Sequence, residues 1–235
     1  MKTPSTRIAI ILFGGIGSRF SLETPKQFVA LNGKPLCYYA VSACEKSKDV
    51  EKIVIVANKN LVEETKNALA PFLFSKIIAF VPGGNTRQES VLSALTYLQE
   101  NSLAEDDDLI LIQDGDRPGL TVELIQENFH IAENLGGAVT ARSSTDSVFL
   151  SSSKKEVDSY LDRSTLLRAE TPQTFRFAPI YNAAKKAQMD GKGFTDDASC
   201  FIYYGGRVGI VLSNGRNQKI TTKEDLYLFE GVNHE

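Results

Sequence analysis

The chain has 235 residues, 42% of them hydrophobic, which is enough to bury one sizeable core and favours one domain or at most two. Charged residues make up 23% and the formal net charge is −3, so a nucleic-acid or membrane-surface protein is not expected, because such proteins need a basic field. No apolar run approaches the roughly 20 residues of a membrane span, and the apolar run after the polar N-terminus is too short for a signal peptide.

Three cysteines and two histidines limit the chemistry further. Cys37, Cys44 and Cys200 form no CxxC pair, so we expect three buried core thiols rather than a disulfide or a zinc site. His130 lies in a helical pattern and His234 is next to last, which leaves little scope for histidine-based nucleophilic catalysis and none for a histidine-rich metal site. A reducing cytoplasm fits this composition best.

Short apolar runs alternate with longer amphipathic segments along the chain. The runs, which we expect to be strands, cover 7–13, 52–57, 76–82, 108–114, 137–142 and 207–213. The amphipathic segments, which we expect to be helices, cover 35–47, 60–74, 87–101, 121–135 and 223–232. The runs are rich in Ile and Val and alternate little, as strands covered on both faces do. This pattern predicts an α/β fold with a mostly parallel sheet, and right-handed crossovers place the loops after the strands along one edge.

Residues 143–177 interrupt that rhythm with polar, turn-rich sequence and only short β-like pieces. The stretch is either a mobile insertion or a protruding arm that packs on a partner or closes the site. No linker or repeat appears elsewhere, so residues 1–235 are expected to form one domain.

Glycines and cations follow the first expected strand. Gly14-Gly15-Ile16-Gly17-Ser18-Arg19 is not a P-loop and is an incomplete dinucleotide fingerprint, because Phe20 stands in place of the third glycine. Pro25 fixes the backbone before Lys26. Glycine amides allow close approach of a phosphate and two cations balance its charge, so the segment suggests a polyphosphate cradle. A tight turn with solvated cations is the alternative.

The residues after the third strand precede a helix. Gly83 and Gly84 lie where free amides face an anion or the edge of a base, and Thr86 with Glu89 has the spacing of a capping box. A well-capped helix with no ligand is the simpler interpretation, and the two are compatible.

Two carboxylates follow the fourth strand in Gln113-Asp114-Gly115-Asp116-Arg117-Pro118. Such a set could bind a metal ion or sugar hydroxyls, or form an ion-paired turn. Lys219 follows the last strand and could return to the same edge as Arg19 and Lys26.

Six motifs in this order, GGxGxR…PKQF, GGxxRQxSV, DxxRP, DR…TPQTF, TDDAS and NxKIT, resemble one family. Over residues 7 to 230 the chain is similar to the sugar-alcohol-phosphate cytidylyltransferases, which act on 2-C-methyl-D-erythritol 4-phosphate or on ribitol 5-phosphate. The resemblance implies a Rossmann-like fold of the nucleotide-diphosphosugar transferase type. It also implies transfer of CMP from CTP to a polyol phosphate, with Mg²⁺ and release of pyrophosphate.

The resemblance assigns roles to matching positions. The implied catalytic residues are Arg19, Lys26 and Lys219. The implied nucleotide-binding residues are Phe13, Gly14, Gly15, Gly17, Gly83, Gly84, Asn85, Arg87, Ser90 and Gly115. The implied acceptor-binding residues are Asp114, Arg117, Ser147, Arg163 and Thr171, and Asp114 is also the implied contact of the metal, directly or through water. In this family Arg163 and Thr171 would lie on an arm that reaches the neighbouring subunit, which implies a homodimer through 143–177.

Several positions depart from the family pattern, among them Phe13, Asp116 and Ser147, which replaces Thr. Phe13 stands where the erythritol-phosphate enzymes usually have Ala, and it either crowds the base or packs inward. Asp116 adds a carboxylate where a small residue is usual. Methylerythritol phosphate is the preferred acceptor, with ribitol phosphate as the alternative. A non-catalytic nucleotide-binding homologue ranks next, and a dinucleotide oxidoreductase last.

Overall fold

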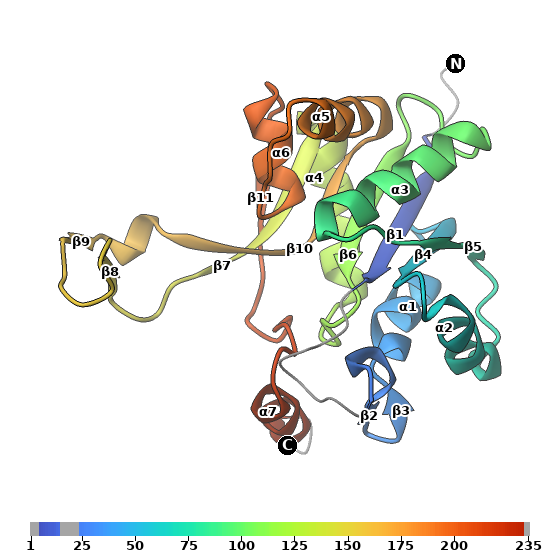
Figure 1. Ribbon diagram of the computed structural model, residues 1–235, viewed down its shortest axis with the longest axis horizontal. Coiled ribbons are helices and arrows are strands. Elements are labelled where there is room, and N and C mark those ends of the chain that lie inside the picture. Colours follow the sequence, from blue (N-terminus) through green and yellow to red (C-terminus); the bar gives the residue numbers. More distant parts are fainter. Residues whose placement is uncertain (1–4, 15–23, 233–235) are drawn as a thin grey trace.

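The computed structural model describes residues 5–14 and 24–232, and a seven-stranded sheet lies at its centre (Figure 1). The strands, in their order across the sheet, are β11 (Gly209–Leu212), β7 (Gly137–Ser143), β10 (Leu167–Arg176), β6 (Leu109–Asp114), β1 (Arg7–Phe13), β4 (Lys52–Ala57) and β5 (Ile77–Pro82). In the described part of the chain β10 alone runs antiparallel to its neighbours in this sheet, so the predicted mostly parallel sheet is confirmed. The carboxyl ends of β1, β4, β5 and β6 therefore lie along one edge.

Helices cover both faces of the sheet. They are α1 (Cys37–Lys46), α2 (Val62–Leu69), α3 (Arg87–Glu100), α4 (Val122–Leu135), α5 (Phe177–Met189), α6 (Asp197–Tyr203) and α7 (Lys223–Val232). Along β1, Ile8, Ile10 and Leu12 pack with α3, α5 and α6, whereas Ala9 and Ile11 pack with α1, α2 and α4. Successive strand residues point to opposite faces, so this strand is apolar throughout because both faces are covered.

Strand β10 and helices α5 and α6 were not among the predicted elements. β10 carries polar residues into the interior, where Thr174 is buried and Gln173 hydrogen-bonds Asp196 at 2.9 Å and the amide of Ala198 at 2.8 Å. The polar sequence of β10 is therefore typical of a loop, and its place in the interior depends on hydrogen-bond partners that only the tertiary structure brings near. Helix α5 buries Phe177, Ile180, Ala183, Ala184 and Ala187. This spacing of three and four is typical of a helix and is present in the sequence.

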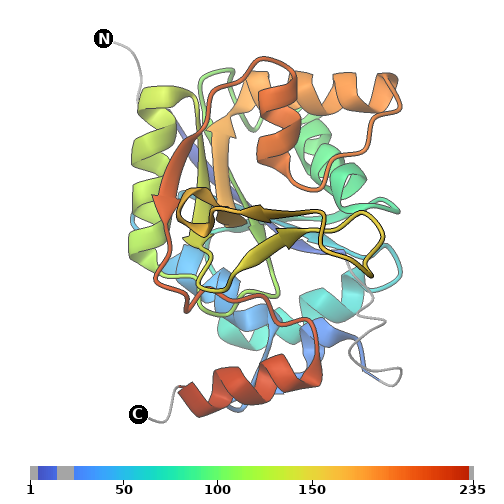
Figure 2. The ribbon, with the colours of Figure 1, turned by 90° about the vertical axis from the view of Figure 1, so that its left-hand side faces the viewer.

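The stretch 143–177 divides into two parts. Residues 144–166 leave the body as an arm whose strands β8 (Val148–Leu150) and β9 (Ser159–Leu161) pair antiparallel (Figures 1 and 2). The rest of the stretch is mostly β10, and positions 170–175 are buried in the central sheet. The protruding segment is thus shorter than the stretch singled out in the sequence.

Smaller elements complete the description. Strands β2 (Ala30–Leu31) and β3 (Lys34–Pro35) pair with each other, and short 3₁₀ turns cover Lys26–Phe28, Ala70–Phe72 and Arg163–Thr165. Within the described ranges, no helix is long and apolar enough to cross a membrane.

The three cysteines are free and buried, as predicted. Burial raises the pKa of Cys37 and of Cys44 to about 12 and that of Cys200 to about 11.

Candidate active site

A small pocket of about 220 Å³ opens at the carboxyl edge of the sheet. Its residues come from the ends of β1 and β6, from the segment between β5 and α3 together with the first turn of α3, and from the segment after β11. They are Leu12, Gly14, Gly84, Asn85, Thr86, Arg87, Ser90, Asp114, Asp116 and Lys219. Parallel strands bring these loops together because their carboxyl ends share one edge. The edge predicted from the sequence is therefore where the charged residues gather.

Asp114 is the centre of an ion-pair network. One of its carboxylate oxygens lies 3.0 Å from Nε of Arg87, and the other lies 3.0 Å from Nζ of Lys219 and 3.7 Å from Nε of Arg117. Burial by itself would raise the pKa of Asp114, but the charges of these three partners outweigh it and hold the pKa well below its ordinary value. Asp114 therefore stays ionised and orients cations at the pocket.

Arg87, the first residue of α3, bridges two carboxylates. Its guanidinium contacts Asp114 on one side and the Oδ2 of Asp197 at 2.7 Å on the other. Burial opposes the charge, yet Asp197 and Asp114 together raise the pKa of Arg87. Burial raises the pKa of Asp197, although Arg87 partly offsets that effect. The sequence contained Asp197 within the TDDAS motif, but only its position against Arg87 reveals its role in holding that side chain.

Lys26 and Lys219 converge on one carboxylate. Lys26 forms an ion pair with Oδ2 of Asp116 and donates a hydrogen bond to the carbonyl of Ile220 at 2.9 Å. Nζ of Lys219 lies 3.6 Å from the other oxygen of Asp116. Two of the three cations implied as catalytic thus meet beside the pocket, although they are almost two hundred positions apart in the chain.

The segment before α3 combines a helix cap with tight glycines. The Thr86 hydroxyl accepts a hydrogen bond from the amide of Glu89 at 3.1 Å, while the Glu89 carboxylate accepts from the amide of Asn85 at 2.7 Å. A Cβ on Gly83 would lie 2.8 Å from Oγ of Ser90, and one on Gly14 would lie 3.2 Å from it. The two glycines let Ser90 approach the ends of β1 and β5, so the predicted cap and the close packing coexist.

Gly15, Gly17 and Arg19 lie outside the described residues. Among those that are described, no group of three His, Cys, Asp or Glu side chains is placed to hold a metal ion.

Comparisons with known proteins show the family of the chain. Residues 7–233 match the family described as IspD: 2-C-methyl-D-erythritol 4-phosphate cytidylyltransferase. The chain belongs to this family. The 2-C-methyl-D-erythritol 4-phosphate cytidylyltransferase of Thermosipho melanesiensis is 38% identical over 94% of this chain and 95% of its own length.

Two further relatives of this IspD family member support the assignment. The ribitol-5-phosphate cytidylyltransferase of Lacticaseibacillus paracasei is 28% identical, over 94% of this chain and 95% of that protein. The crystal structure of Francisella tularensis 2-C-methyl-D-erythritol 4-phosphate cytidylyltransferase superposes with a TM-score of 0.79 at 27% identity, covering 95% of this chain and 98% of that one. The predicted family and fold class are thereby confirmed.

Phe13, a departure from the usual IspD sequence, packs inward. It is 5% exposed and belongs to the core between the sheet and helices α1, α2 and α4. Its ring fills the space beside Gly115, where a Cβ would overlap it. The aromatic ring therefore does not line the small pocket, and Gly115 gives it room.

The residues implied as acceptor contacts of an IspD enzyme fall into two groups. The expectation that Thr171 lies on the arm is wrong, because Thr171 is buried in the part of β10 that belongs to the central sheet, where it accepts a hydrogen bond from the amide of Asp114 at 3.0 Å. Arg117 donates to the carbonyl of Asn217 at 2.9 Å. Ser147 and Arg163 are exposed on the arm, where Arg163 donates to the carbonyl of Thr145 at 2.6 Å. Within one chain the structure does not bring this second group to the pocket.

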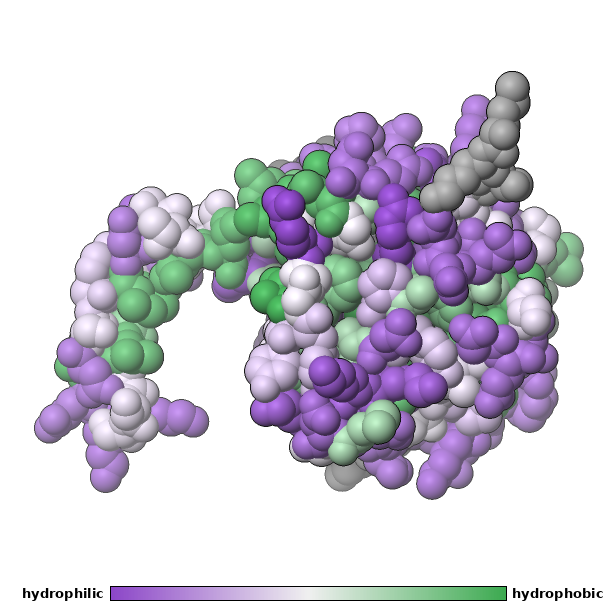
Figure 3. All heavy atoms as spheres, turned by 90° about the horizontal axis from the view of Figure 1, so that it is seen from above, coloured by the Kyte–Doolittle hydropathy of each residue, from purple (hydrophilic) through white to green (hydrophobic). Residues whose placement is uncertain are grey.

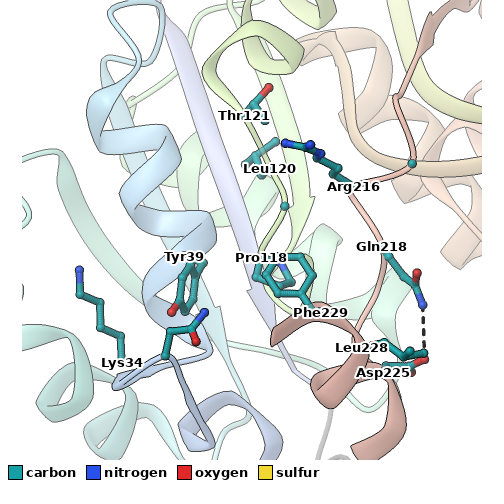
Figure 4. Close-up of a pocket in the computed structure, with 13 residues that line it drawn as sticks. Lys34, Tyr39, Pro118, Leu120, Thr121, Arg216, Gln218, Asp225, Leu228 and Phe229 are labelled. Carbon is teal, nitrogen blue, oxygen red and sulfur yellow. Dashed lines mark hydrogen bonds between the residues drawn. The ribbon is translucent and has the colours of Figure 1, made fainter. Parts of the chain in front are cut away.

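A larger hollow of about 570 Å³ lies beside the same segment, between the chain after β6, the chain after β11 and α7 (Figure 4). Asp225 accepts hydrogen bonds from the amides of Thr221 and Thr222 at 2.8 Å and from Gln218 at 3.4 Å. These bonds fix the ends of the segment that carries Lys219. None of the residues implied as functional lines this hollow, whereas several of them line the smaller pocket.

Proposed function

We propose that this chain transfers CMP from CTP to a polyol phosphate and releases pyrophosphate, with 2-C-methyl-D-erythritol 4-phosphate as the acceptor. The single observation that carries the proposal is the convergence of Lys26, Lys219 and Arg87 around one pocket at the carboxyl edge. The family and its relatives with 35–38% identity support the same acceptor.

The chemistry needs cations rather than a general base. An oxygen of the acceptor phosphate, already anionic, forms a bond to the α-phosphorus of CTP, while the bond from that phosphorus to the bridging oxygen breaks and its electron pair leaves with pyrophosphate. Negative charge builds on the α-phosphoryl oxygens and on the leaving group, so positioning and cationic stabilisation dominate. Lys26 and Lys219 are suited to these roles, and we propose Arg19 as a third cation.

Mg²⁺ belongs to the same proposal. Such an ion is usually held by one or two carboxylates together with the phosphates of the substrate. The donor set fits this mode: Asp114 lines the pocket but already contacts Arg87, Lys219 and Arg117, so triphosphate oxygens would supply most of the ligands. When bound, the ion would neutralise charge on the triphosphate.

We further propose a homodimer formed through the arm. Phe149 is 54% exposed and Tyr160 is 61% exposed on the hairpin, although the two rings pack together. Figure 3 shows hydrophobic residues along the arm and where it meets the body. A second copy would cover this surface, and it would bring Ser147 and Arg163 to the partner's acceptor site.

The test measures pyrophosphate release from CTP and Mg²⁺ with each of two acceptors, methylerythritol phosphate and ribitol phosphate. Turnover with the first and little with the second is expected. The reverse preference would assign the chain to ribitol phosphate, a reading that the glycine-rich first loop and the Lacticaseibacillus relative support. Tight CTP binding without pyrophosphate release from either would indicate a non-catalytic homologue.

Lys26→Ala tests the catalytic cation within the same assay. A decrease in kcat of roughly 10²-fold or more is expected, about 3 kcal/mol at ~1.4 kcal/mol per decade. Lys185, exposed on α5, provides the matched control, and Lys185→Ala should leave kcat unchanged. Near-normal turnover of Lys26→Ala would remove Lys26 from the catalytic set.

A further inference from the structure

Asp116 connects three segments that meet at the pocket. Its side chain pairs with Lys26, which follows β1, and its second oxygen lies 3.6 Å from Nζ of Lys219, which follows β11. Its backbone carbonyl accepts a hydrogen bond from the amide of Ile220 at 2.8 Å. Since Lys26 also donates to the carbonyl of Ile220, the contacts form a closed ring.

This ring fixes side chains that would otherwise be mobile. A lysine has a flexible stem of four carbons, and two lysines that approach one pocket repel each other. The side chain of Asp116 is 17% exposed and that of Lys26 is 13% exposed, so solvent screens their interaction little. A carboxylate between the two ammonium groups offsets their repulsion and defines where Nζ of each one lies.

The same carboxylate could instead compete with the triphosphate for the lysines. The donor count argues against this alternative. An ammonium group has three N–H donors, and Lys26 uses one on Asp116 and one on the carbonyl of Ile220. One donor remains for a phosphate oxygen. The side chain of Lys219 is 39% exposed and also lines the pocket, so it too can reach a ligand while near Asp116.

We propose that Asp116 is a positioning residue, which holds Lys26 and Lys219 at a fixed separation before CTP binds. This inference rests on the proposed transfer of CMP. Asp116 acts through the two lysines and not on the substrate.

Steady-state kinetics of Asp116→Asn and Asp116→Glu test the proposal. Asn keeps the shape but removes the charge, so kcat should fall at least tenfold while KM for CTP changes less than threefold. Glu keeps the charge and should recover part of the lost kcat. The matched control is Asp106→Asn, which removes an exposed carboxylate before β6 and should leave kcat unchanged. A lower KM for CTP with undiminished kcat would show that Asp116 is a competitor and overturn the proposal.

A double-mutant cycle with Lys26→Ala tests whether Asp116 acts through Lys26. If Asp116 acts through Lys26, adding Asp116→Asn to Lys26→Ala should lower kcat much less than it does in the wild type. Full additivity would contradict positioning through Lys26. An unfolded Asp116→Asn variant, recognised by circular dichroism, leaves Asp116→Glu to decide: a kcat less than tenfold below that of the wild type supports the proposal, and a loss of tenfold or more with the fold intact contradicts it.

A crystal structure of ligand-free Asp116→Asn provides a readout independent of activity. Displacement of Nζ of Lys26 from the carbonyl of Ile220 is expected, and lysines that superpose on those of the wild type would overturn the inference. Wild-type protein without turnover would overturn the proposed function alone, because this structural comparison would still test the role of Asp116.

Discussion

Asp114 shows why single residues at this site cannot be interpreted in isolation. A buried carboxylate is costly unless cations and hydrogen bonds compensate it. Arg87, Arg117 and Lys219 provide the cations, and Asp114 in turn keeps three positive charges close together. Arg117 is a local partner, three positions after Asp114, but Arg87 and Lys219 come from distant parts of the chain, so the complete network forms only with the fold.

Replacing Asp114 by Asn should therefore destabilise the protein by about 3 kcal/mol at pH 7, because buried cations lose their partner. The pKa of Asp114 is lowered in the folded state, so its contribution is present above its unfolded pKa of about 3.9 and is lost as the pH falls further. Urea denaturation of both proteins in EDTA, at pH 7 and near pH 3, should show a smaller difference in the free energy of unfolding at low pH. A constant difference would contradict the ion-pair explanation.

At the scale of elements, the site depends on two segments that pack against each other. The chain after β6 supplies Asp116 and Arg117, and the chain after β11 supplies Lys219. Arg117 donates to the carbonyl of Asn217, and Ile220 donates to the carbonyl of Asp116. One side-chain and one backbone hydrogen bond therefore hold the segment that carries Lys219 against the segment after β6.

Gly119 permits this approach, because a Cβ there would overlap the backbone carbonyl of Arg216. A backbone atom cannot move aside by changing a rotamer. We expect Gly119→Ala to lower the free energy of unfolding by about 1–3 kcal/mol. The substitution should also decrease kcat, because it would displace Arg216, and Lys219 lies only three positions after Arg216. Thermal melts and pyrophosphate release measure both effects, with Gly193→Ala as the control, where a Cβ meets open space. An unchanged kcat would show that the packing at Gly119 does not determine the position of Lys219.

At the scale of the whole molecule, the arm differs from the rest because its hairpin does not pack into the core clusters. Residues on both faces of the sheet pack into continuous apolar clusters with the helices. The hairpin of β8 and β9 instead extends away from the body (Figure 1) with Phe149 and Tyr160 exposed. An extended segment with exposed aromatic side chains is typical of a surface that a partner covers.

The double variant Phe149→Ser/Tyr160→Ser should sediment as a monomer at micromolar concentrations where we expect the wild type to sediment as a dimer. The body should stay folded, as judged by circular dichroism, because these side chains lie outside the core clusters. Activity should fall as well, since the proposed site takes Ser147 and Arg163 from the partner's arm. Lys155→Ser, an exposed change on the same arm, is the control. A wild type that sediments as a monomer would contradict the dimer.

The sequence by itself determined the features that depend on local pattern. Apolar runs predicted six strands of the sheet. The inner strands β1, β4 and β6 are apolar at nearly every position because both of their faces are covered, whereas the edge strands β5 and β11 are apolar but partly exposed. Helical spacing indicated five helices, and the position of charged residues after the strands predicted the edge of the sheet where they gather. The pairing of Thr86 with Glu89 was also readable, since a helix cap is formed by neighbours in the chain.

Only the tertiary structure decided the features that depend on distant partners. The polar strand β10 lies in the interior because Gln173 finds hydrogen bonds on Asp196 and Ala198. Phe13 turns inward because Gly115 leaves room for its ring, and Asp197 has a role only because α6 places it against Arg87. A residue pattern reports burial and local conformation, whereas the partner that satisfies a buried polar or charged group is fixed by the fold.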